Sequence, residues 1–220
     1  MGEWWVQRWL EQSGYVFLFS WVFWVIFSIC LHELAHGWAA LEQGDDTPIA
    51  LGHMTMNPMV HMGPMSLLVF AFIGIAWGLM PVSPSRFRDG PLGHAKVAAA
   101  GPAMNLLLAL AALTVLGAVE AGAGGGASMI VDHLRAFLWA GGMLNLALML
   151  FNLLPIPPLD GSSILAGLSP AAARFYHREG MDRLGLLAFV LVFWFGGRYL
   201  WSAAATAGTL WRDFIVDVLT

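Results

Sequence analysis

The chain has 220 residues, of which 59% are hydrophobic and 11% charged, with a formal net charge of -4 and a mean hydropathy of +0.71. Soluble globular domains carry charges on about a quarter of their residues, so this sequence cannot cover a water-facing surface of its size. An ordinary soluble enzyme and a disordered chain are excluded, and so is nucleic acid as a partner, because its binding requires a basic surface. The composition predicts one membrane-embedded domain with the lipid bilayer as its surroundings.

Uncharged apolar runs indicate the membrane-spanning elements, because a transmembrane helix needs about 20 mostly apolar residues. The first run is expected to stay helical to about residue 40, the third ends in prolines, and the fourth is expected to extend to about residue 205. The charged tail, residues 200–220, is interpreted as interfacial or as a continuation of the fourth helix. The four runs are residues 13–31, 97–119, 136–159 and 184–197.

The first run ends in His-Glu-Leu-Ala-His at positions 32–36. Residues four apart on a helix share one face, so His32 and His36 can both reach one tetrahedral zinc ion. In this H-E-x-x-H pattern the glutamate, here Glu33, is the general base toward water activated by the metal. Ionisable residues inside a membrane helix are costly and indicate function. The alternative for these three is a polar network between helices or a position at the water boundary.

A second candidate lies at the end of the third run, in the sequence NLLPIPPLDG that starts at Asn152. Its prolines break the helix, and a broken helix at membrane depth is tolerated where it lines a cavity or is covered by protein. Catalytic zinc takes three protein ligands plus water, so Asp160, which follows the prolines, is the expected third ligand. A plain Asp-Gly turn is the alternative, and the H-E-x-x-H motif favours the ligand.

Four stretches together resemble the site-2 protease family of intramembrane zinc metalloproteases, in the compact bacterial and archaeal branch that lacks PDZ and CBS domains. The resemblance implies His32, His36 and Asp160 as ligands of one zinc ion per chain, and Glu33 as the catalytic base. It also implies hydrolysis of peptide bonds inside or at the edge of a prokaryotic cytoplasmic membrane, in transmembrane protein or peptide substrates. The matching stretches are residues 32–36, 52–64, 100–105 (AGPAMN) and 152–161.

Residues 57–64 resemble the N-P-x-x-H-x-D-P stretch of that branch, except that Gly63 stands in place of the acid. Any role of that acid is therefore absent or filled elsewhere. Asn57 and His61 match the stretch and are supporting candidates for substrate binding. His61 is a candidate for orienting a ligand or holding substrate, and the alternative is a polar loop residue near the membrane surface.

Three asparagines lie in the later runs. The resemblance suggests that Asn152 pairs with unwound substrate backbone or with the developing oxyanion, which would stabilise the transition state. Asn105 and Asn145 are interpreted as hydrogen-bonding partners between helices.

A single zinc site imposes a topology. His32 and His36 lie near the end of the first helix and Asp160 follows the end of the third run, so both must run in the same direction. The interrupted apolar stretch at residues 63–81 then cannot cross the membrane once, and its glycines and prolines fit a re-entrant segment. We expect an all-α polytopic membrane protein with a core of three transmembrane helices around a buried zinc site, this re-entrant segment and one or two C-terminal helices.

The chain is expected to form a single metalloprotease domain, with an interfacial segment at residues 1–14, a catalytic core at 15–165 and C-terminal helices at 166–220. Basic residues favour the cytoplasm, and six of the ten share the side of the zinc site, which predicts an active site toward the cytosol. These six are Arg86, Arg88, Lys96, Arg174, Arg178 and Arg183, and the other four are Arg8, Arg135, Arg198 and Arg212.

Two other functions stay open for this sequence. A catalytically inactive zinc-binding membrane scaffold that binds transmembrane helices is the first, but such a protein need not keep Glu33. A transporter-like helical bundle is the second. It predicts repeated halves, and the sequence shows no internal repeat.

Overall fold

The structure, a computed structural model, describes residues 5–122 and 128–220, and this part of the chain is helical without β-strands. The long helices are α1 (Trp5–Glu42), α5 (Pro91–Gly122), α6 (Met129–Asn152) and α10 (Gly197–Leu219). The shorter elements are α2 (Thr47–Ala50), α3 (Pro58–His61), α4 (Gly63–Ile73), η1 (Pro84–Arg86), α7 (Asp160–Leu168), α8 (Pro170–Tyr176), α9 (Met181–Leu191) and the π-helical η2 (Val192–Gly196).

Four helical segments of the described residues are long and apolar enough to cross a membrane: residues 13–42, 91–122, 129–152 and 183–219. The chain is therefore an all-α polytopic membrane protein, as the composition predicted. The last segment runs without interruption from α9 through η2 into α10. The charged tail is thus a continuation of the fourth helix.

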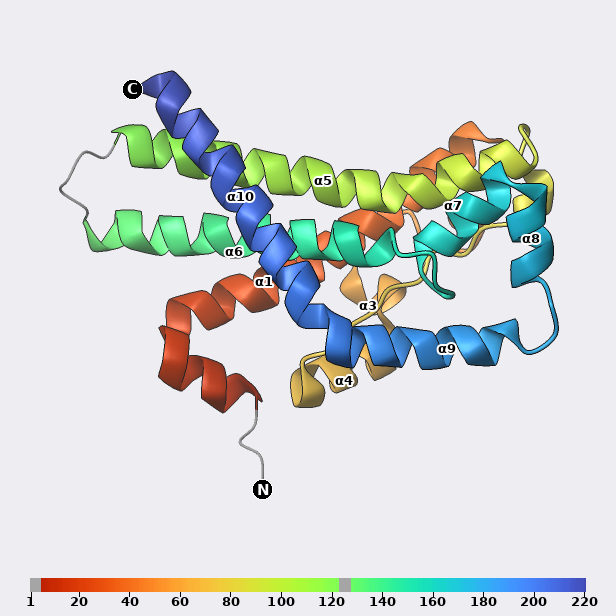
Figure 1. Ribbon diagram of the computed structural model, residues 1–220, viewed down its shortest axis with the longest axis horizontal. Coiled ribbons are helices and arrows are strands. Elements are labelled where there is room, and N and C mark those ends of the chain that lie inside the picture. Colours follow the sequence, from red (N-terminus) through yellow and green to blue (C-terminus); the bar gives the residue numbers. More distant parts are fainter. Residues whose placement is uncertain (1–4, 123–127) are drawn as a thin grey trace.

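The core lies where α1, α5 and α6 pack against one another. In Figure 1, α1 and α6 run in the same direction and α5 runs opposite to them. Small residues allow close helix approach. The Trp24 ring packs against Gly141, and its Nε1–H donates to the Phe137 carbonyl over 2.9 Å. Leu113 is fully buried against Gly142.

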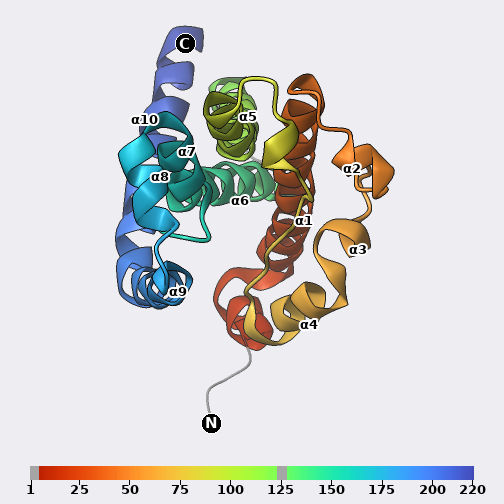
Figure 2. The same ribbon diagram turned by 90° about the vertical axis from the view of Figure 1, so that its right-hand side faces the viewer.

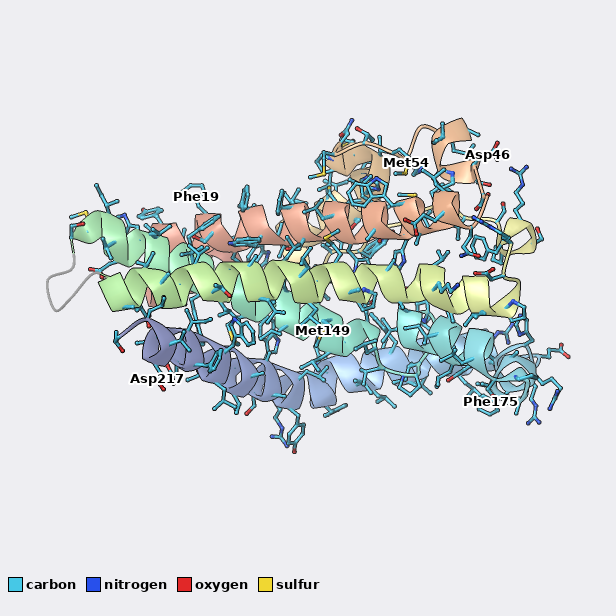
Figure 3. The ribbon with its side chains drawn as sticks, turned by 90° about the horizontal axis from the view of Figure 1, so that it is seen from above. Phe19, Asp46, Met54, Met149, Phe175 and Asp217 are labelled. Atoms are coloured by element: carbon cyan, nitrogen blue, oxygen red, sulfur yellow. The ribbon has the colours of Figure 1, made fainter. Side chains whose placement is uncertain are left out.

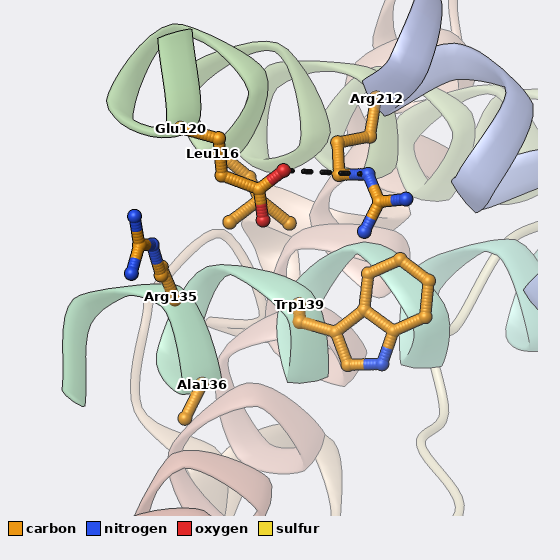
Figure 4. Close-up of a pocket in the computed structure, with 6 residues that line it drawn as sticks. All are labelled: Leu116, Glu120, Arg135, Ala136, Trp139 and Arg212. Atoms are coloured by element: carbon orange, nitrogen blue, oxygen red, sulfur yellow. Dashed lines mark ion pairs between the residues drawn. The ribbon is translucent and has the colours of Figure 1, made fainter. Parts of the chain in front are cut away.

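The C-terminal helix α10 crosses this core toward the end where α5 finishes and α6 begins (Figure 1). Trp211 Nε1–H donates to Thr114 Oγ1 over 2.9 Å, and Arg212 Nε lies 3.4 Å from Glu120 Oε2. Figure 4 shows this ion pair beside a cavity of about 330 Å³, which also contacts Arg135 and Trp139. These contacts fasten α10 to α5.

The interrupted apolar stretch at residues 63–81 folds as the short helix α4, followed by extended chain that runs back beside it. The 11-residue α4 is about 16 Å long, half of the roughly 30 Å hydrocarbon core of a bilayer. It ends at Ile73 and is capped by Gly74, whose φ of 85° is left-handed. Residues 75–83, called here the return segment, come back beside it. Trp77 N–H donates to Ser66 Oγ, and Leu79 N–H donates to the His61 carbonyl over 2.9 Å. This is the shape expected of a re-entrant segment.

Asp45 fixes the far end of the return segment. Its buried carboxylate accepts hydrogen bonds from Ser83 N–H over 2.6 Å and from Thr47 N–H over 3.1 Å. Burial alone would raise the pKa of the Asp45 carboxyl, but the hydrogen bonds from Thr47 and Ser83 outweigh it and hold this pKa below its usual value.

The beginning of α1 is set off from the membrane-length part by Gly14, whose φ of 76° and ψ of 173° interrupt the helix. Trp5 Nε1–H donates to the Ala71 carbonyl over 3.1 Å, which ties this first part to α4. Residues 1–4 lie outside the described residues, and the interfacial position of residues 1–14 stays a prediction.

Candidate metal centre

Three predicted ligands converge although 124 positions separate the last two along the chain. Their ligand atoms all lie within 4.8 Å of one another. His32 Nε2 is 3.0 Å from His36 Nε2 and 3.2 Å from Asp160 Oδ2, and His36 Nε2 is 3.4 Å from Asp160 Oδ1. Both histidines are buried, and the Asp160 side chain is 19% exposed.

Helices α1 and α6 run in the same direction. The segment that follows α6 and contains Asp160 therefore lies near the two histidines in the C-terminal part of α1. Helix α6 ends at Asn152, and α7 begins at Asp160 and packs against α5 (Figure 2). The turn between them is tight, because a Cβ on Gly161 would lie 2.3 Å from the Leu153 carbonyl oxygen. Glycine at 161 therefore lets α7 start directly against the end of α6.

Two groups of helix α5 orient the imidazole rings of His32 and His36 by contacting their Nδ1 atoms. His32 Nδ1 lies 2.6 Å from Asn105 Oδ1, and His36 Nδ1 lies 2.7 Å from the Val97 carbonyl oxygen. Both partners are acceptors, since Asn105 Nδ2–H is used on Asn145, so each Nδ1 carries the hydrogen and each neutral ring keeps its Nε2 lone pair. A metal-bound histidine is held in this way by its second nitrogen.

The convergence of these lone pairs fits a bound cation. Two imidazole nitrogens and a carboxylate oxygen at 3.0–3.4 Å repel one another unless a proton or a metal lies between them. Two histidines and one aspartate form a three-ligand set that leaves a fourth position open, as catalytic zinc requires. The residues present therefore fit a zinc ion.

Behind His32, the hydrogen bonds continue through two fully buried asparagines. Asn105 Nδ2–H donates to Asn145 Oδ1 over 3.0 Å, and Asn145 Nδ2–H donates to Ser28 Oγ and to the Gly141 carbonyl. The expectation of hydrogen bonding between helices is confirmed for both asparagines. The contact of Asn105 with His32 was not predicted from the sequence.

Gly101 provides the space for the two rings. A Cβ at this position would lie 2.4 Å from His36 Nε2 and 2.6 Å from His32 Nε2, which is closer than real Cβ atoms come. Val97, Gly101 and Asn105 follow one another at intervals of four residues and so form one face of α5. The four-residue spacing of Val97, Gly101 and Asn105 is the sequence feature from which a helix face toward the two histidines could have been predicted.

Glu33 lies beside the ligands and is buried under the return segment. A Cβ at Gly78 would lie 2.5 Å from Glu33 Oε1 and 2.6 Å from its Cγ. Glycine at 78 thus lets the extended backbone touch the carboxylate. The sequence predicted the re-entrant shape of this segment but not its contact with Glu33.

The three supporting candidates lie in different settings. His61 is buried, and its Nε2 lies 2.6 Å from the Thr55 carbonyl oxygen, while its buried Nδ1 has no hydrogen-bond partner among the described residues. Asn57 caps α3 by accepting from Met59 N–H. Asn152 donates to the Leu148 carbonyl of its own helix. No hydrogen bond in the described structure joins these three to the ligand cluster.

In the part of the chain that the structure describes, four membrane-length helical segments and a His-His-Asp cluster define a polytopic membrane protein with a candidate metal site. The model of Peptidase family M50 matches residues 20–195, so the chain belongs to this family, the site-2 protease family, and is a zinc metalloprotease. No solved structure matches the chain.

Two curated relatives agree with this assignment. The Bacillus subtilis protein named "Putative zinc metalloprotease YwhC" is 34% identical over 170 residues, 77% of this chain and 77% of its own length. The Mycobacterium tuberculosis protein named "Putative zinc metalloprotease Rip2" is 32% identical over 151 residues, 64% of this chain and 54% of its own length.

Proposed function

We propose that this chain hydrolyses peptide bonds within or near transmembrane segments of membrane proteins. His32, His36 and Asp160 would hold one zinc ion, and Glu33 would be the general base. The observation that carries the proposal is the convergence of the three ligand atoms within 4.8 Å beside a buried glutamate. Three of these four residues lie inside a membrane-length segment, residues 13–42, which supports cleavage at membrane depth.

The chemistry divides between the metal and the chain. A zinc ion, when bound, supplies a Lewis acid that polarises a carbonyl and lowers the pKa of water. Glu33 takes a proton from the attacking water at its carboxylate and later passes it to the leaving amine. Asn105 and the Val97 carbonyl hold the two imidazoles so that Nε2 of each faces the centre. Gly101 keeps that space free.

The remaining candidates, His61, Asn57 and Asn152, would bind the substrate or support its binding. His61 Nε2–H is used on Thr55, so its buried Nδ1 lone pair is available to accept from a peptide N–H. Asn57 supports this position by capping α3. Asn152 would stabilise the oxyanion through its Nδ2–H, which requires its side chain to turn away from the Leu148 carbonyl.

The setting is proposed as a prokaryotic cytoplasmic membrane with the metal centre toward the cytosol, in agreement with the excess of basic residues on that side. The membrane-spanning helices place the protein in a bilayer. The division into an interfacial segment at 1–14, a catalytic core at 15–165 and C-terminal helices at 166–220 is part of the same proposal.

The test compares wild type with Glu33→Gln, both purified in detergent and assayed on a single-span substrate. Wild type should cleave, and the variant should retain its zinc but lose cleavage, since the amide cannot accept the proton. Mass spectrometry of the products locates the cut relative to the apolar stretch. Cleavage by Glu33→Gln at the wild-type rate would show that another group is the base.

A further inference from the structure

A groove lies along α1, and its lining reaches Cys30, three residues before Glu33. It encloses about 200 Å³ and is lined by Phe23, Ile26, Phe27, Cys30 and Met56. Its four α1 residues are spaced by three and four positions and therefore share one face of the helix. Cys30 and Ile26 precede Glu33 by three and seven residues, so the same face continues to Glu33.

The groove opens toward the bilayer. The Phe23 and Phe27 rings are stacked with centroids 5.3 Å apart, and Phe23 is 46% exposed. Figure 3 places Phe19 and Met54 on the side of α1 that faces away from α5. A helix moving within the membrane could therefore reach the groove without entering the core.

One residue of the groove lining, Met56, belongs to a methionine-rich segment of the chain, residues 54–65. Residues 54–65 contain five of the 12 methionines of the chain. Met56 lines the groove, and Met56, Met59 and Met65 are exposed. Methionine is unbranched and polarisable, and surfaces rich in it adapt to partners of different shape. The role predicted for this segment rested on Asn57 and His61 and did not include its methionines.

The methionine-rich segment also meets the return segment on α1. A Cβ at Gly37 would lie 2.6 Å from Met54 Sδ and 3.0 Å from Met80 Cε, so both side chains pack on Gly37. Gly37 follows Glu33 by four residues and lies on the same helix face. The groove, Glu33 and this pair of methionines thus lie in series along α1.

We infer that the groove and the methionine-rich segment dock the apolar helix of a substrate, beside the stretch of peptide that reaches Glu33. This inference rests on the proposed function. The groove lining contains no charged side chain, so the partner it fits is an apolar transmembrane helix. The continuity with Glu33 favours a substrate over a lipid chain, and the adaptable methionines fit helices of different sequence.

Photo-crosslinking tests the docking site without turnover. A photoreactive amino acid replaces Phe23 or Met56 in zinc-loaded Glu33→Gln protein. The probe is a labelled synthetic helix of about 20 apolar residues. The control position is Leu107 of α5, which is 60% exposed and outside the groove. Crosslinks at 23 and 56 that exceed those at 107 are expected.

The outcomes separate this inference from the proposed function, because cleavage of the same probe by wild type is scored independently. Cleavage without preferential crosslinks at 23 and 56 overturns the docking site and leaves the protease intact. Crosslinks at 23 and 56 without cleavage support docking and contradict the function. Equal crosslinking at all three positions shows contact with the probe at any lipid-facing surface, as expected if lipid fills the groove, and overturns the inference.

Kinetics provide a second readout. Phe23→Trp adds bulk inside the groove and should raise KM about tenfold, the scale of one misfitted apolar contact, with kcat unchanged. The matched control is Phe19→Trp, one turn away and outside the groove lining. Zinc content confirms that each variant is folded. An unchanged KM in Phe23→Trp contradicts the inference.

Discussion

Asn105 accepts a hydrogen bond from His32 over 2.6 Å, across 73 positions of sequence. This contact joins the second membrane-length helix to the candidate metal centre and sets which nitrogen of His32 faces Asp160. The same helix accepts from His36 through the Val97 carbonyl. Helix α5 therefore orients both histidines in addition to packing against α1.

Removing this acceptor should weaken metal binding. Asn105→Leu leaves His32 Nδ1–H buried without a partner, and zinc affinity should fall about 10–100-fold, the usual effect of losing such support. Asn105→Asp keeps an acceptor and should retain most of the affinity. Zinc titration of the metal-stripped protein with a competing chelator measures both. Equal affinity in Asn105→Leu and wild type would show that the contact does not orient the ligand.

Adding a methyl group at position 101 should block the centre. In Gly101→Ala the Cβ would lie 2.4 Å from His36 Nε2, so the rings must move apart and zinc content should drop. Gly122→Ala on the same helix is the matched control, because nothing lies within 4 Å of its Cβ. A full zinc complement in Gly101→Ala would contradict the described geometry.

A substitution at Gly78 should lower kcat without changing the zinc content. The Cβ of Gly78→Ala would lie 2.5 Å from Glu33 Oε1, which displaces the carboxylate from its working position. A displacement of about 1 Å can cost about 100-fold in rate. We expect kcat to fall on that scale with zinc content unchanged. Gly197→Ala, whose Cβ has open space, serves as the control, and equal kcat in both variants would refute the contact.

The contribution of Asp45 to stability should depend on pH. Its folded-state pKa lies below the unfolded value of about 3.9, so ionised Asp45 stabilises the fold above that pH and loses this effect as the pH falls through the folded-state value. Asp45→Asn should lower Tm at neutral pH, and its difference from wild type should shrink below about pH 4. Thermal unfolding in detergent measures this, and a pH-independent difference would exclude the assigned role.

The sequence predicted that His32, His36 and Asp160 come together, and the three side chains lie in one cluster. His32 and His36 are one helical turn apart, and the H-E-x-x-H motif together with the proline break favoured Asp160 as the third member. The sequence also predicted four apolar helices, and all four are present. The helix ends were less predictable. The third apolar run reaches residue 159, and its prolines were expected to break the helix; the exact end at Asn152 follows because Pro155 disfavours helical backbone in the residue before it.

Contacts between distant elements could not be predicted in the same way. Apolar runs do not specify which face of α5 meets α1, so the role of Asn105 toward His32 required the packed structure. The contact of Gly78 with Glu33 likewise depends on how the return segment crosses α1. Asp160 was weighed against a turn, and the structure instead places it at the first position of α7.

Metal content tests the central claim most directly, since that claim joins two distant motifs in one site. Wild type, His36→Ala and Asp160→Ala would be purified in detergent and analysed by elemental mass spectrometry beside a protein determination. We predict about one zinc per chain in wild type, the occupancy of a three-ligand catalytic site, and a clear loss in both variants. Full zinc in Asp160→Ala, or no zinc in a folded and monodisperse wild type, would contradict the account.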